Sequence, residues 1–317
     1  MRIFVTGVTG FAGSWLAETL LARGGGTIAG LARSSRWPLS CQHLEDRVRL
    51  FHCDMADGPA IDRILRTFEP QQIYHLAGFP HVGLSFKDPD AAWQTNLAGT
   101  RCLYDAVKRW GGSPRILFVS SGQVYGDPER PDEEFAEERP LKPTSPYGAS
   151  KAAADLLSYQ VCRSDGLAII RVRPFNHFGP RQSSDFAVGS FARQLAEVRL
   201  GRRPPILQTG DLSAERDLTD VRDIVAGYVA LMERSRPGEV YNLASGTRLV
   251  MQQVVDRLVA LTGVAIEVQR RDELCRPTEP PRLRVNTERL RAATGWKPRY
   301  TLDETLRDTL DYWSGVG

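Results

Sequence analysis

The chain has no run of about 18 consecutive apolar residues, so its sequence predicts no membrane-spanning helix. Its N-terminus enters a strand-like pattern at once and lacks the long apolar region of a signal peptide, so we expect no secretory signal. The five cysteines form no C-x-x-C pair and the five histidines form no close pair, so neither residue type has the spacing of a metal site. An odd number of cysteines without a secretion signal predicts a reducing, cytoplasmic location.

The chain also has little net charge. Its 41 lysines and arginines against 38 acidic residues give +3, too small for a nucleic-acid-binding protein unless the charge gathers on one face. The 28 glycines and 20 prolines are ordinary numbers and exclude a collagen-like or low-complexity chain. An apolar fraction of 42% and a length of 317 residues predict a soluble globular protein of about two domains.

Short apolar segments alternate with helical patterns in the first half of the chain. This alternation predicts an α/β fold, a doubly wound Rossmann-type parallel sheet with helices on both faces. We expect strands near residues 3–5, 27–33, 48–52, 72–76, 115–120 and 166–173, and helices near residues 11–23, 59–68, 88–110, 146–162, 186–200, 220–233 and 250–262. Because the pattern is less regular after about Pro174, we expect a dinucleotide-binding domain in residues 1–174 and a smaller α/β lobe in residues 175–317.

A glycine motif, Gly7-x-x-Gly10-x-x-Gly13, lies between the first predicted strand and the first predicted helix. Glycine there allows a tight turn and lets backbone N–H groups approach a pyrophosphate at the helix N-terminus. A glycine triplet alone is weak evidence, but the strand–turn–helix context predicts dinucleotide binding rather than a plain turn.

The end of the second predicted strand indicates which nicotinamide cofactor is bound. An acidic residue there would accept hydrogen bonds from the ribose of NAD, whereas this chain has Arg33-Ser34-Ser35-Arg36. Guanidinium groups and hydroxyls suit a 2′-phosphate, so the segment favours NADP(H); a solvated basic turn is the alternative. Asp54, after the third strand, could contact the adenine amino group or cap the following helix.

A second motif, Tyr147-Gly148-Ala149-Ser150-Lys151, lies on a predicted helix. Residues four apart share a helix face, so the Tyr147 phenol and the Lys151 ammonium can reach one site. A nearby cation lowers the pKa of a phenol and makes it usable as an acid or base. Together with Ser121 at the end of a predicted strand, these residues form a candidate catalytic set.

These features resemble the extended short-chain dehydrogenases/reductases that act on nucleotide sugars, over essentially the whole chain. The matching segments are VTGVTGFAG, NLAGT, VSSGQVYG, SPYGASK, RPFNHFGPRQ, ERDLTDVRDIV, VYNLASG, RPTEPPRLRVNTERL and TGWKPRYTL. Within that superfamily, RPFNHFGP, SSGQVYG and RPTEPP are most similar to GDP-4-keto-6-deoxy-D-mannose reductases, and GDP-mannose 4,6-dehydratases come next.

The resemblance implies NAD(P)H-dependent reduction of the 4-keto group of GDP-4-dehydro-6-deoxy-D-mannose to GDP-D-rhamnose, with NADP(H) preferred and NAD(H) possible. It implies catalysis by Ser121, Tyr147 and Lys151. The cofactor-binding residues that it implies are Gly7, Gly10, Phe11, Gly13, Arg33, Ser34, Arg36, Asp54, Met55, Leu76, Ala77, Gly78, Asn96, Tyr147, Lys151 and Pro174. The substrate-binding residues that it implies are His81, Ser85, Ser121, Gly122, Gln123, Asn176, Val188, Arg216, Arg276 and Glu279.

Some of these assignments have structural alternatives. Arg216 could form an ion pair with Asp217 or Asp220, Arg276 could be a solvated loop charge, and His177 could be a structural histidine or a substrate contact. The resemblance also implies a homodimer that pairs through helices 88–110 and 146–162, with no nucleic-acid or membrane partner.

The reaction type depends on the segment after Ser121. Dehydration needs an extra acid and base beside the tyrosine, and Gly122 and Gln123 cannot ionise. The sequence therefore favours a reductase over a GDP-mannose 4,6-dehydratase, with a nucleotide-sugar 4-epimerase third. An NADP(H)-binding scaffold or redox sensor is the non-enzymatic alternative, and the retention of all three catalytic candidates speaks against it.

Overall fold

The computed structural model describes residues 1–24, 26–275 and 283–315. A seven-stranded sheet forms its centre, in the order β12-β7-β5-β4-β1-β2-β3, and every neighbouring pair is parallel. Its strands are β1 (Arg2–Thr6), β2 (Thr27–Ala32), β3 (Arg49–His52), β4 (Gln72–His75), β5 (Arg115–Val119), β7 (Ala168–Pro174) and β12 (Val240–Leu243). The predicted α/β Rossmann-type fold is confirmed.

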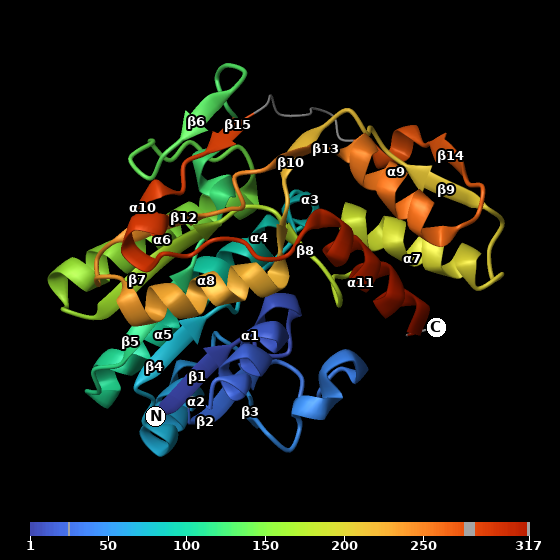
Figure 1. Cartoon of the computed structure of the whole chain (residues 1–317). Helices are drawn as coiled ribbons and strands as arrows, with labels where there is room; N and C mark the ends of the chain where they lie inside the picture. The colour runs from blue at the N-terminus through green and yellow to red at the C-terminus, as the bar shows by residue number, and fades with distance from the viewer. Residues whose placement is uncertain (25, 276–282, 316–317) are drawn as a thin grey trace.

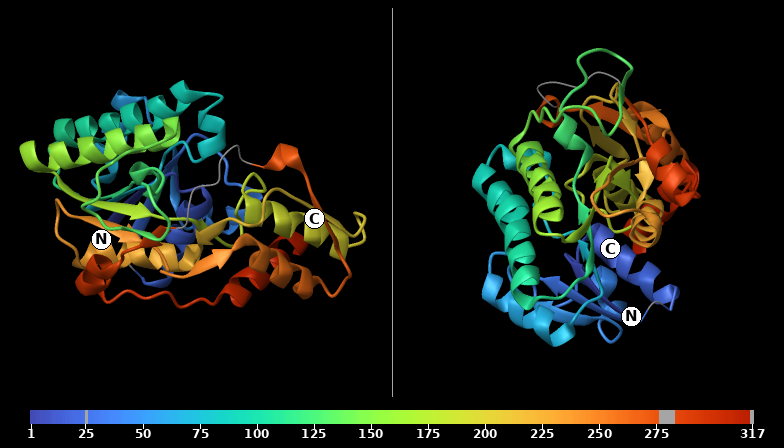
Figure 2. Two further views of the ribbon diagram at one scale, coloured as in Figure 1. Left: turned by 90° about the horizontal axis from the view of Figure 1, so that it is seen from above. Right: turned by 90° about the vertical axis from the view of Figure 1, so that its left-hand side faces the viewer.

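Helices cover both faces of this sheet, as Figures 1 and 2 show. One face carries α1 (Phe11–Ala22), α8 (Val221–Arg234) and α10 (Glu288–Thr294); the other carries α2 (Gly58–Phe68), α5 (Gly99–Trp110) and α6 (Pro146–Ser164). The sequence of β1 illustrates why: Ile3 and Val5 pack in the α1–α8 core, and Phe4 packs in the opposite core. Successive side chains of a strand point to opposite faces, so a strand buried on both faces is apolar throughout.

The strand order reverses between β1 and β4, because β1 has β2 on one side and β4 on the other. Such a switch point leaves a crevice at the carboxyl ends of the strands, where ligands of doubly wound sheets bind. The loops that begin at Gly7 and at Leu76 leave β1 and β4 at this point. The fold therefore places the glycine motif and the segment after β4 beside each other.

A second lobe packs around its own apolar core, formed by residues such as Phe191, Leu195, Val254, Leu258 and Leu306. It contains α7 (Ala187–Arg199), α9 (Met251–Thr262), α11 (Leu302–Gly315), and the parallel pair β9 (Ile206–Thr209) and β14 (Glu267–Arg270). Smaller strand pairs are β8 (His177–Phe178) with β11 (Thr219–Asp220), β10 (Glu215–Asp217) with β13 (Arg248–Val250), and β6 (Glu133–Phe135) with β15 (Leu283–Val285). The chain crosses between the lobes: α8, β12 and α10 follow residue 174 in sequence but pack on the first lobe's sheet.

The helix expected at residues 88–110 is interrupted. The chain forms α4 (Pro89–Trp93), a π-type turn at Gln94–Ala98, and then α5. The wider turn carries Asn96, whose buried side chain accepts a hydrogen bond from Phe79 N and donates one to Ser150 Oγ. The remaining short elements are α3 (Val82–Ser85) and the 3₁₀ helices Leu39–Leu44, Gly122–Tyr125 and Asp272–Leu274.

Candidate active site

The glycine motif forms a cradle that side chains would fill. Gly7 has a φ of +72°, and a Cβ on it would lie 3.0 Å from the backbone nitrogen of Ala77. A Cβ on Gly13 would lie 2.1 Å from the carbonyl oxygen of Gly7. Gly10 precedes α1 without a side-chain cap, so the N-terminal N–H groups of that helix face the loop. This geometry fits a dinucleotide pyrophosphate, as the motif predicts.

The residues that would select the cofactor lie at the end of β2. Arg33, Ser34 and Arg36 are exposed, and the Ser34 hydroxyl donates to Arg36 O and accepts from Arg36 N at 2.9 and 3.1 Å. These bonds fix the backbone of a tight turn, from which both exposed arginine side chains can reach a ligand. This turn is compatible with a 2′-phosphate.

Asp54 does not cap α2. Its carboxylate accepts from Ala56 N at 2.8 Å, whereas Asp57 accepts from Ala60 N at 2.9 Å and caps the helix. Asp54 is exposed at the end of β3, which leaves the adenine contact as its functional interpretation. The neighbouring Met55 is buried in the core between α2 and α5.

Ser121, Tyr147 and Lys151 come together at the carboxyl end of β5. The Ser121 hydroxyl lies close enough to the Tyr147 phenol to lower its pKa, and it accepts a hydrogen bond from Gln123 N at 3.1 Å. Lys151, one helical turn after Tyr147 on α6, donates from Nζ to Val119 O at 3.0 Å. The three side chains predicted as a catalytic set therefore share one site.

Burial changes the ionisation of this site. It raises the pKa of Tyr147, although Ser121 opposes the rise, so Tyr147 is a phenol at neutral pH. The lowering by the Lys151 ammonium that the motif predicts is not found, because desolvation dominates the shift. Burial lowers the pKa of Lys151 to about 8, because desolvation penalises its ammonium, and Asp155 opposes the shift. Tyr147, protonated at neutral pH and one helical turn from the buried Lys151, can therefore act as a proton donor.

Capping groups hold Tyr147 in place. Ser145 accepts from Gly148 N at 3.0 Å as the N-cap of α6, and Ser85 Oγ accepts from Tyr147 N at 3.1 Å. The Ser85 hydroxyl also donates to Val82 O at 2.6 Å and is fully buried. Ser85, predicted to bind substrate, is therefore placed where it orients the catalytic helix.

A buried polar chain below the site was missed by the sequence reasoning. Thr6 Oγ1 lies 2.7 Å from His75 Nδ1, and His75 Nε2 lies 2.9 Å from Thr100 Oγ1, which donates to Asn96 O at 2.6 Å. Burial, with a smaller contribution from the charge of Lys151, lowers the pKa of His75 to about 3. A neutral His75 thus donates to Thr100 and accepts from Thr6. The sequence does contain a sign of this chain: the polar residues Thr6 and His75 end the strands β1 and β4, whose central residues are apolar.

Four further predicted cofactor residues, Leu76, Ala77, Gly78 and Pro174, lie at or just after the ends of strands in the same region. A Cβ on Gly78 would lie 2.7 Å from Asn96 Oδ1 and 3.0 Å from Lys151 Nζ, so only glycine fits between these groups. Leu76 and Ala77 pack on opposite cores on either side of the sheet. Pro174 ends β7, paired with Leu243 of β12.

Two predicted substrate residues, His81 and Asn176, contact segments that follow residue 174. His81 Nε2 lies 3.2 Å from Asp185 O, and its ring contacts Phe186, directly before α7 and Val188. Asn176 is exposed and its carbonyl accepts from Thr219 N at 3.0 Å.

The remaining predicted substrate residues are Gly122, Gln123, Arg216, Arg276 and Glu279. Gln123 is exposed, whereas a Cβ on Gly122 would lie 2.8 Å from the Phe175 ring, which makes Gly122 a packing position. Arg216 lies on β10 and donates to Glu215 O at 2.8 Å. Arg276 and Glu279 lie outside the described residues.

His177 lies against the glycine motif. Its ring stacks on Phe11, with centroids 5.8 Å apart and planes inclined by 5°. Its Nδ1 lies 3.1 Å from Phe175 O and donates to it, because a carbonyl oxygen can only accept. Burial lowers the pKa of His177, so the ring is neutral. The stack accounts for His177 structurally and places it between the cofactor cradle and Asn176.

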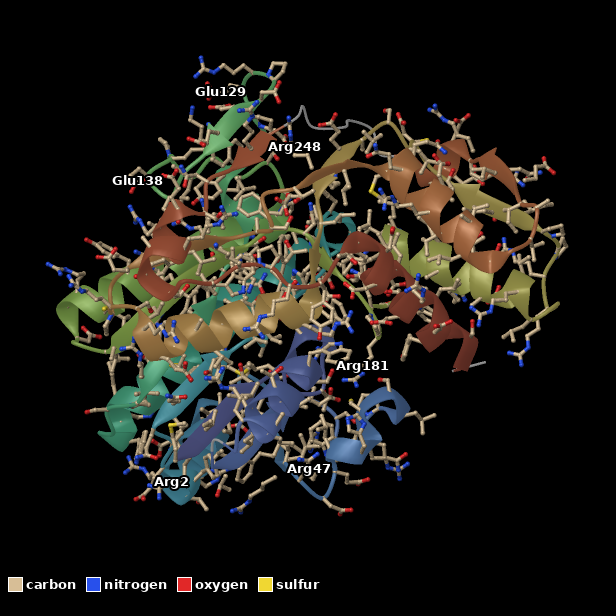
Figure 3. All side chains as sticks on the ribbon, in the orientation of Figure 1. Arg2, Arg47, Glu129, Glu138, Arg181 and Arg248 are labelled. Atoms are coloured by element: carbon tan, nitrogen blue, oxygen red, sulfur yellow. The ribbon has the colours of Figure 1, made fainter. Side chains whose placement is uncertain are left out.

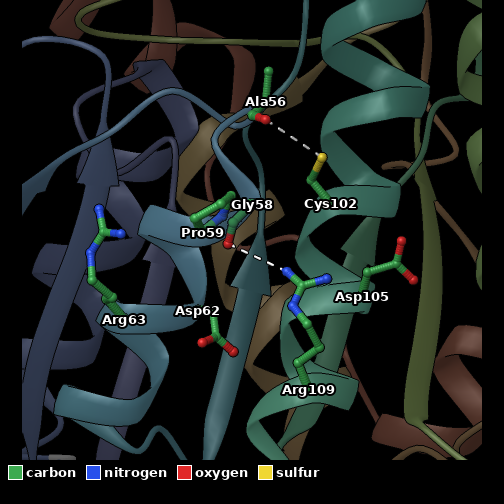
Figure 4. Close-up of a pocket in the computed structure, with 8 residues that line it drawn as sticks. All are labelled: Ala56, Gly58, Pro59, Asp62, Arg63, Cys102, Asp105 and Arg109. Atoms are coloured by element: carbon green, nitrogen blue, oxygen red, sulfur yellow. Dashed lines mark hydrogen bonds between the residues drawn. The ribbon is translucent and has the colours of Figure 1, made fainter.

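A separate hollow of about 540 Å³ lies between α2 and α5, away from this site (Figure 4). Its lining includes Asp62, Cys102 and Arg109, and Arg109 donates to Gly58 O at 3.4 Å. It contains none of the predicted catalytic, cofactor or substrate residues.

Within the described ranges, no group of three or more His, Cys, Asp or Glu side chains could hold a metal ion. Among the helices that the structure describes, none is both long and apolar enough to cross a membrane.

Fold and site together define a dinucleotide-dependent enzyme of the short-chain dehydrogenase/reductase class. A family model described as GDP-mannose 4,6 dehydratase matches residues 4–309, and the chain belongs to this family. The chain is 33% identical to GDP-6-deoxy-D-mannose reductase of Pseudomonas aeruginosa, over 98% of this chain and 97% of the relative.

Solved structures agree with this membership. RMD from Pseudomonas aeruginosa complexed with NADPH superimposes with a TM-score of 0.85 at 32% identity, over 100% of this chain and 99% of the other. UDP-glucose 4-epimerase of Thermus thermophilus, in complex with NAD, gives a TM-score of 0.87 at 30% identity, over the whole of both chains.

Proposed function

We propose that the protein reduces the 4-keto group of GDP-4-dehydro-6-deoxy-D-mannose to give GDP-D-rhamnose, with NADPH preferred and NADH accepted. The observation that carries the proposal is the set of Ser121, Tyr147 and Lys151, of which Ser121 and Lys151 are buried and Tyr147 is partly accessible, with no ionisable side chain at residues 122–123. The similarity to a GDP-6-deoxy-D-mannose reductase over nearly the whole chain supports the substrate.

The protein's own groups would bind, orient and protonate the substrate. The Ser121 hydroxyl holds the oxygen on carbon 4, and the Tyr147 phenol donates its proton to that oxygen as negative charge develops. Lys151 would position the nicotinamide ribose and stabilise the phenolate that proton transfer leaves behind. The bound cofactor supplies the hydride.

The cofactor would lie across the switch point, with its pyrophosphate on the loop of Gly7, Gly10 and Gly13. Arg33 and Arg36 would meet a 2′-phosphate, and Asp54 would meet the adenine. Three observations support this placement: the cradle that a Cβ would fill, the exposed guanidinium groups, and the NADPH complex of the Pseudomonas aeruginosa structure.

Reduction rather than dehydration follows from where the carboxylates lie. Asp155, one turn beyond Lys151, is fully buried and bound to Arg171 and Arg173 at 2.9 Å each. Burial raises the pKa of Asp155, but the two guanidinium groups outweigh that effect and lower it. The carboxylate is therefore ionised and paired with both arginines, and it is not available as the acid or base of a dehydration. Gly122, packed on Phe175, leaves no room for an added acid.

The second lobe would hold the nucleotide diphosphate of the sugar. Asn176 and Arg216 are candidates, together with Arg276 and Glu279 from outside the described residues. His81 contacts Phe186 next to α7, whereas Val188 is buried in the core of the second lobe. Arginine forks suit phosphate oxygens, and a carboxylate suits the ribose hydroxyls.

Two incubations of the purified protein test this function. With GDP-4-dehydro-6-deoxy-D-mannose, NADPH should be oxidised in proportion to the sugar added. With GDP-mannose alone, no 4-keto-6-deoxy product should accumulate. Efficient dehydration of GDP-mannose would assign the protein to the dehydratases instead. Tight NADPH binding without oxidation by any 4-keto nucleotide sugar would favour the scaffold.

We also propose that the protein is a homodimer. Adjacent helices α3, α4 and α6 leave large apolar side chains exposed: Leu84 by 46%, Trp93 by 38%, Leu156 by 57% and Tyr159 by 45%. Leu156 and Tyr159 are three residues apart and share one face of α6. A second copy of the same surface would cover these side chains. Leu156→Asp should then give a monomer in light scattering, while a dimer of unchanged mass would contradict this interface.

A further inference from the structure

One face of α1 is engaged by the segment that follows β7. Phe11, Trp15 and Glu18 are four and three residues apart, so they line the same side of the helix. This side faces the segment from His177 to Arg181 in the second lobe. The N-terminus of the same helix carries the glycine motif, and the segment directly follows Asn176.

Contacts run along the whole of this face. Phe11 stacks on His177, and Trp15 donates from Nε1 to Pro180 O at 3.0 Å. The Arg181 guanidinium lies over the Trp15 ring, 4.1 Å from its centroid, and forms an ion pair with Glu18 at 2.7 Å. These contacts join the cofactor-binding helix to the substrate lobe. Figure 3 shows Arg181 beside α1.

The backbone of Arg181 is in the left-handed region, with a φ of +75°. Glycine adopts this conformation without steric cost, whereas an L side chain does not. The side chain is nevertheless largely buried, with 14% exposed, and its partner Glu18 also pairs with His43. The Arg181 side chain contacts three residues of α1, namely Trp15, Glu18 and, at 3.5 Å, the hydroxyl of Ser14. A side chain held by such contacts at a strained backbone position points to a role that glycine would not fill.

We propose that Arg181 is a positioning residue that fixes the His177–Arg181 segment on α1, and thereby sets Asn176 and His177 at their distance from the cofactor cradle. This inference rests on the proposed function, because it assigns substrate affinity to Asn176 and its neighbours. Arg181 acts through the segment that it anchors and through Glu18. Its loss would loosen the substrate side while leaving the glycine motif in place.

Arg181→Gly is the informative variant, because it removes the anchor and relieves the backbone strain at once. The KM for GDP-4-dehydro-6-deoxy-D-mannose should rise on the order of tenfold, since small displacements of binding groups have large effects. The Kd for NADPH should stay within about threefold, because the main contacts of Arg181 on α1 are with Trp15 and Glu18, beyond the glycine motif. Glu18→Gln, which breaks the pair from the helix side, should raise KM in the same direction.

Glu69→Gly is the matched control. Glu69 also has a positive φ, +47°, and an ion pair, with Arg2 at 3.2 Å, but this pair is exposed and lies at the end of α2. Its removal should leave KM within about threefold, as exposed ion pairs contribute little. Arg181→Lys retains a charge for Glu18 and should recover part of the lost affinity.

The outcome separates this inference from the proposed function. Wild-type protein that does not turn over the keto sugar would refute the function; the anchor is then tested by calorimetry with GDP on protein loaded with NADP⁺. GDP binding should be weakened in Arg181→Gly and unchanged in Glu69→Gly. Equal KM and equal GDP affinity in Arg181→Gly and wild type would overturn the role of Arg181. A fall in melting temperature with unchanged KM would assign it to stability alone.

Discussion

Tyr147→Phe separates the chemical step from cofactor binding. The phenyl ring fills the same space on α6, and the change removes only the hydroxyl, whose pKa Ser121 lowers. Ser121 keeps its hydrogen bond from Gln123 N, and the backbone of Tyr147 keeps its bond to Ser85. The fold should therefore remain intact, with the loss of about 1 kcal/mol that one hydrogen bond contributes.

Turnover should change far more than stability. Loss of a positioned proton donor costs roughly 100- to 10,000-fold in rate, which corresponds to about 3–5 kcal/mol in the activation barrier. Burial raises the pKa of Tyr147, so the wild-type residue carries the proton at neutral pH and the variant has none to give. Lys151→Met should lower both turnover and NADPH affinity, because this ammonium is proposed to bind the nicotinamide ribose.

The assay measures NADPH oxidation by stopped-flow absorbance and NADPH affinity by fluorescence titration. Tyr312→Phe, on α11 and outside both the site and the proposed dimer interface, is the matched control and should behave as wild type. If Tyr147→Phe retains more than about a tenth of the wild-type rate, the loss is too small for a general acid. The proton would then come from another group, with His177 or an ordered water as the next candidate.

Three further predictions concern the cofactor and pH. Arg33→Ala should reduce the preference for NADPH over NADH on the order of tenfold, as charge-assisted bonds to a phosphate are lost; equal affinities in the wild type would contradict the assignment. Gly13→Ala should abolish most NADPH binding, because its Cβ would lie 2.1 Å from Gly7 O; Gly315→Ala, with open space around it, is the control, and near-normal binding by Gly13→Ala would refute the cradle. Because burial lowers the pKa of Lys151 to about 8, its charge is present below that pH and lost above it. The kcat/KM for reduction should therefore fall above about pH 8, and a flat profile to about pH 10 would argue against this role.

Local sequence pattern determined much of this protein. Apolar segments and helical periods gave the strands and helices of the first lobe within a few residues, because burial on one or two faces fixes those periods. The glycine motif, the turn at Arg33–Arg36 and the Tyr147–Lys151 spacing also depend only on short-range geometry. These features were sufficient for the Rossmann-type fold and the candidate catalytic set.

Only the tertiary structure decided which distant segments meet. It returned β12 to the edge of the first sheet, brought His75 between Thr6 and Thr100, and set the His177–Arg181 segment on α1. It also turned Ser85 toward the backbone of Tyr147. Such contacts join residues that are far apart in sequence, so they depend on how elements pack and which buried polar groups must be satisfied. Neither the hydrophobic periodicity nor the spacing of motifs in a single sequence shows which distant residues will be in contact.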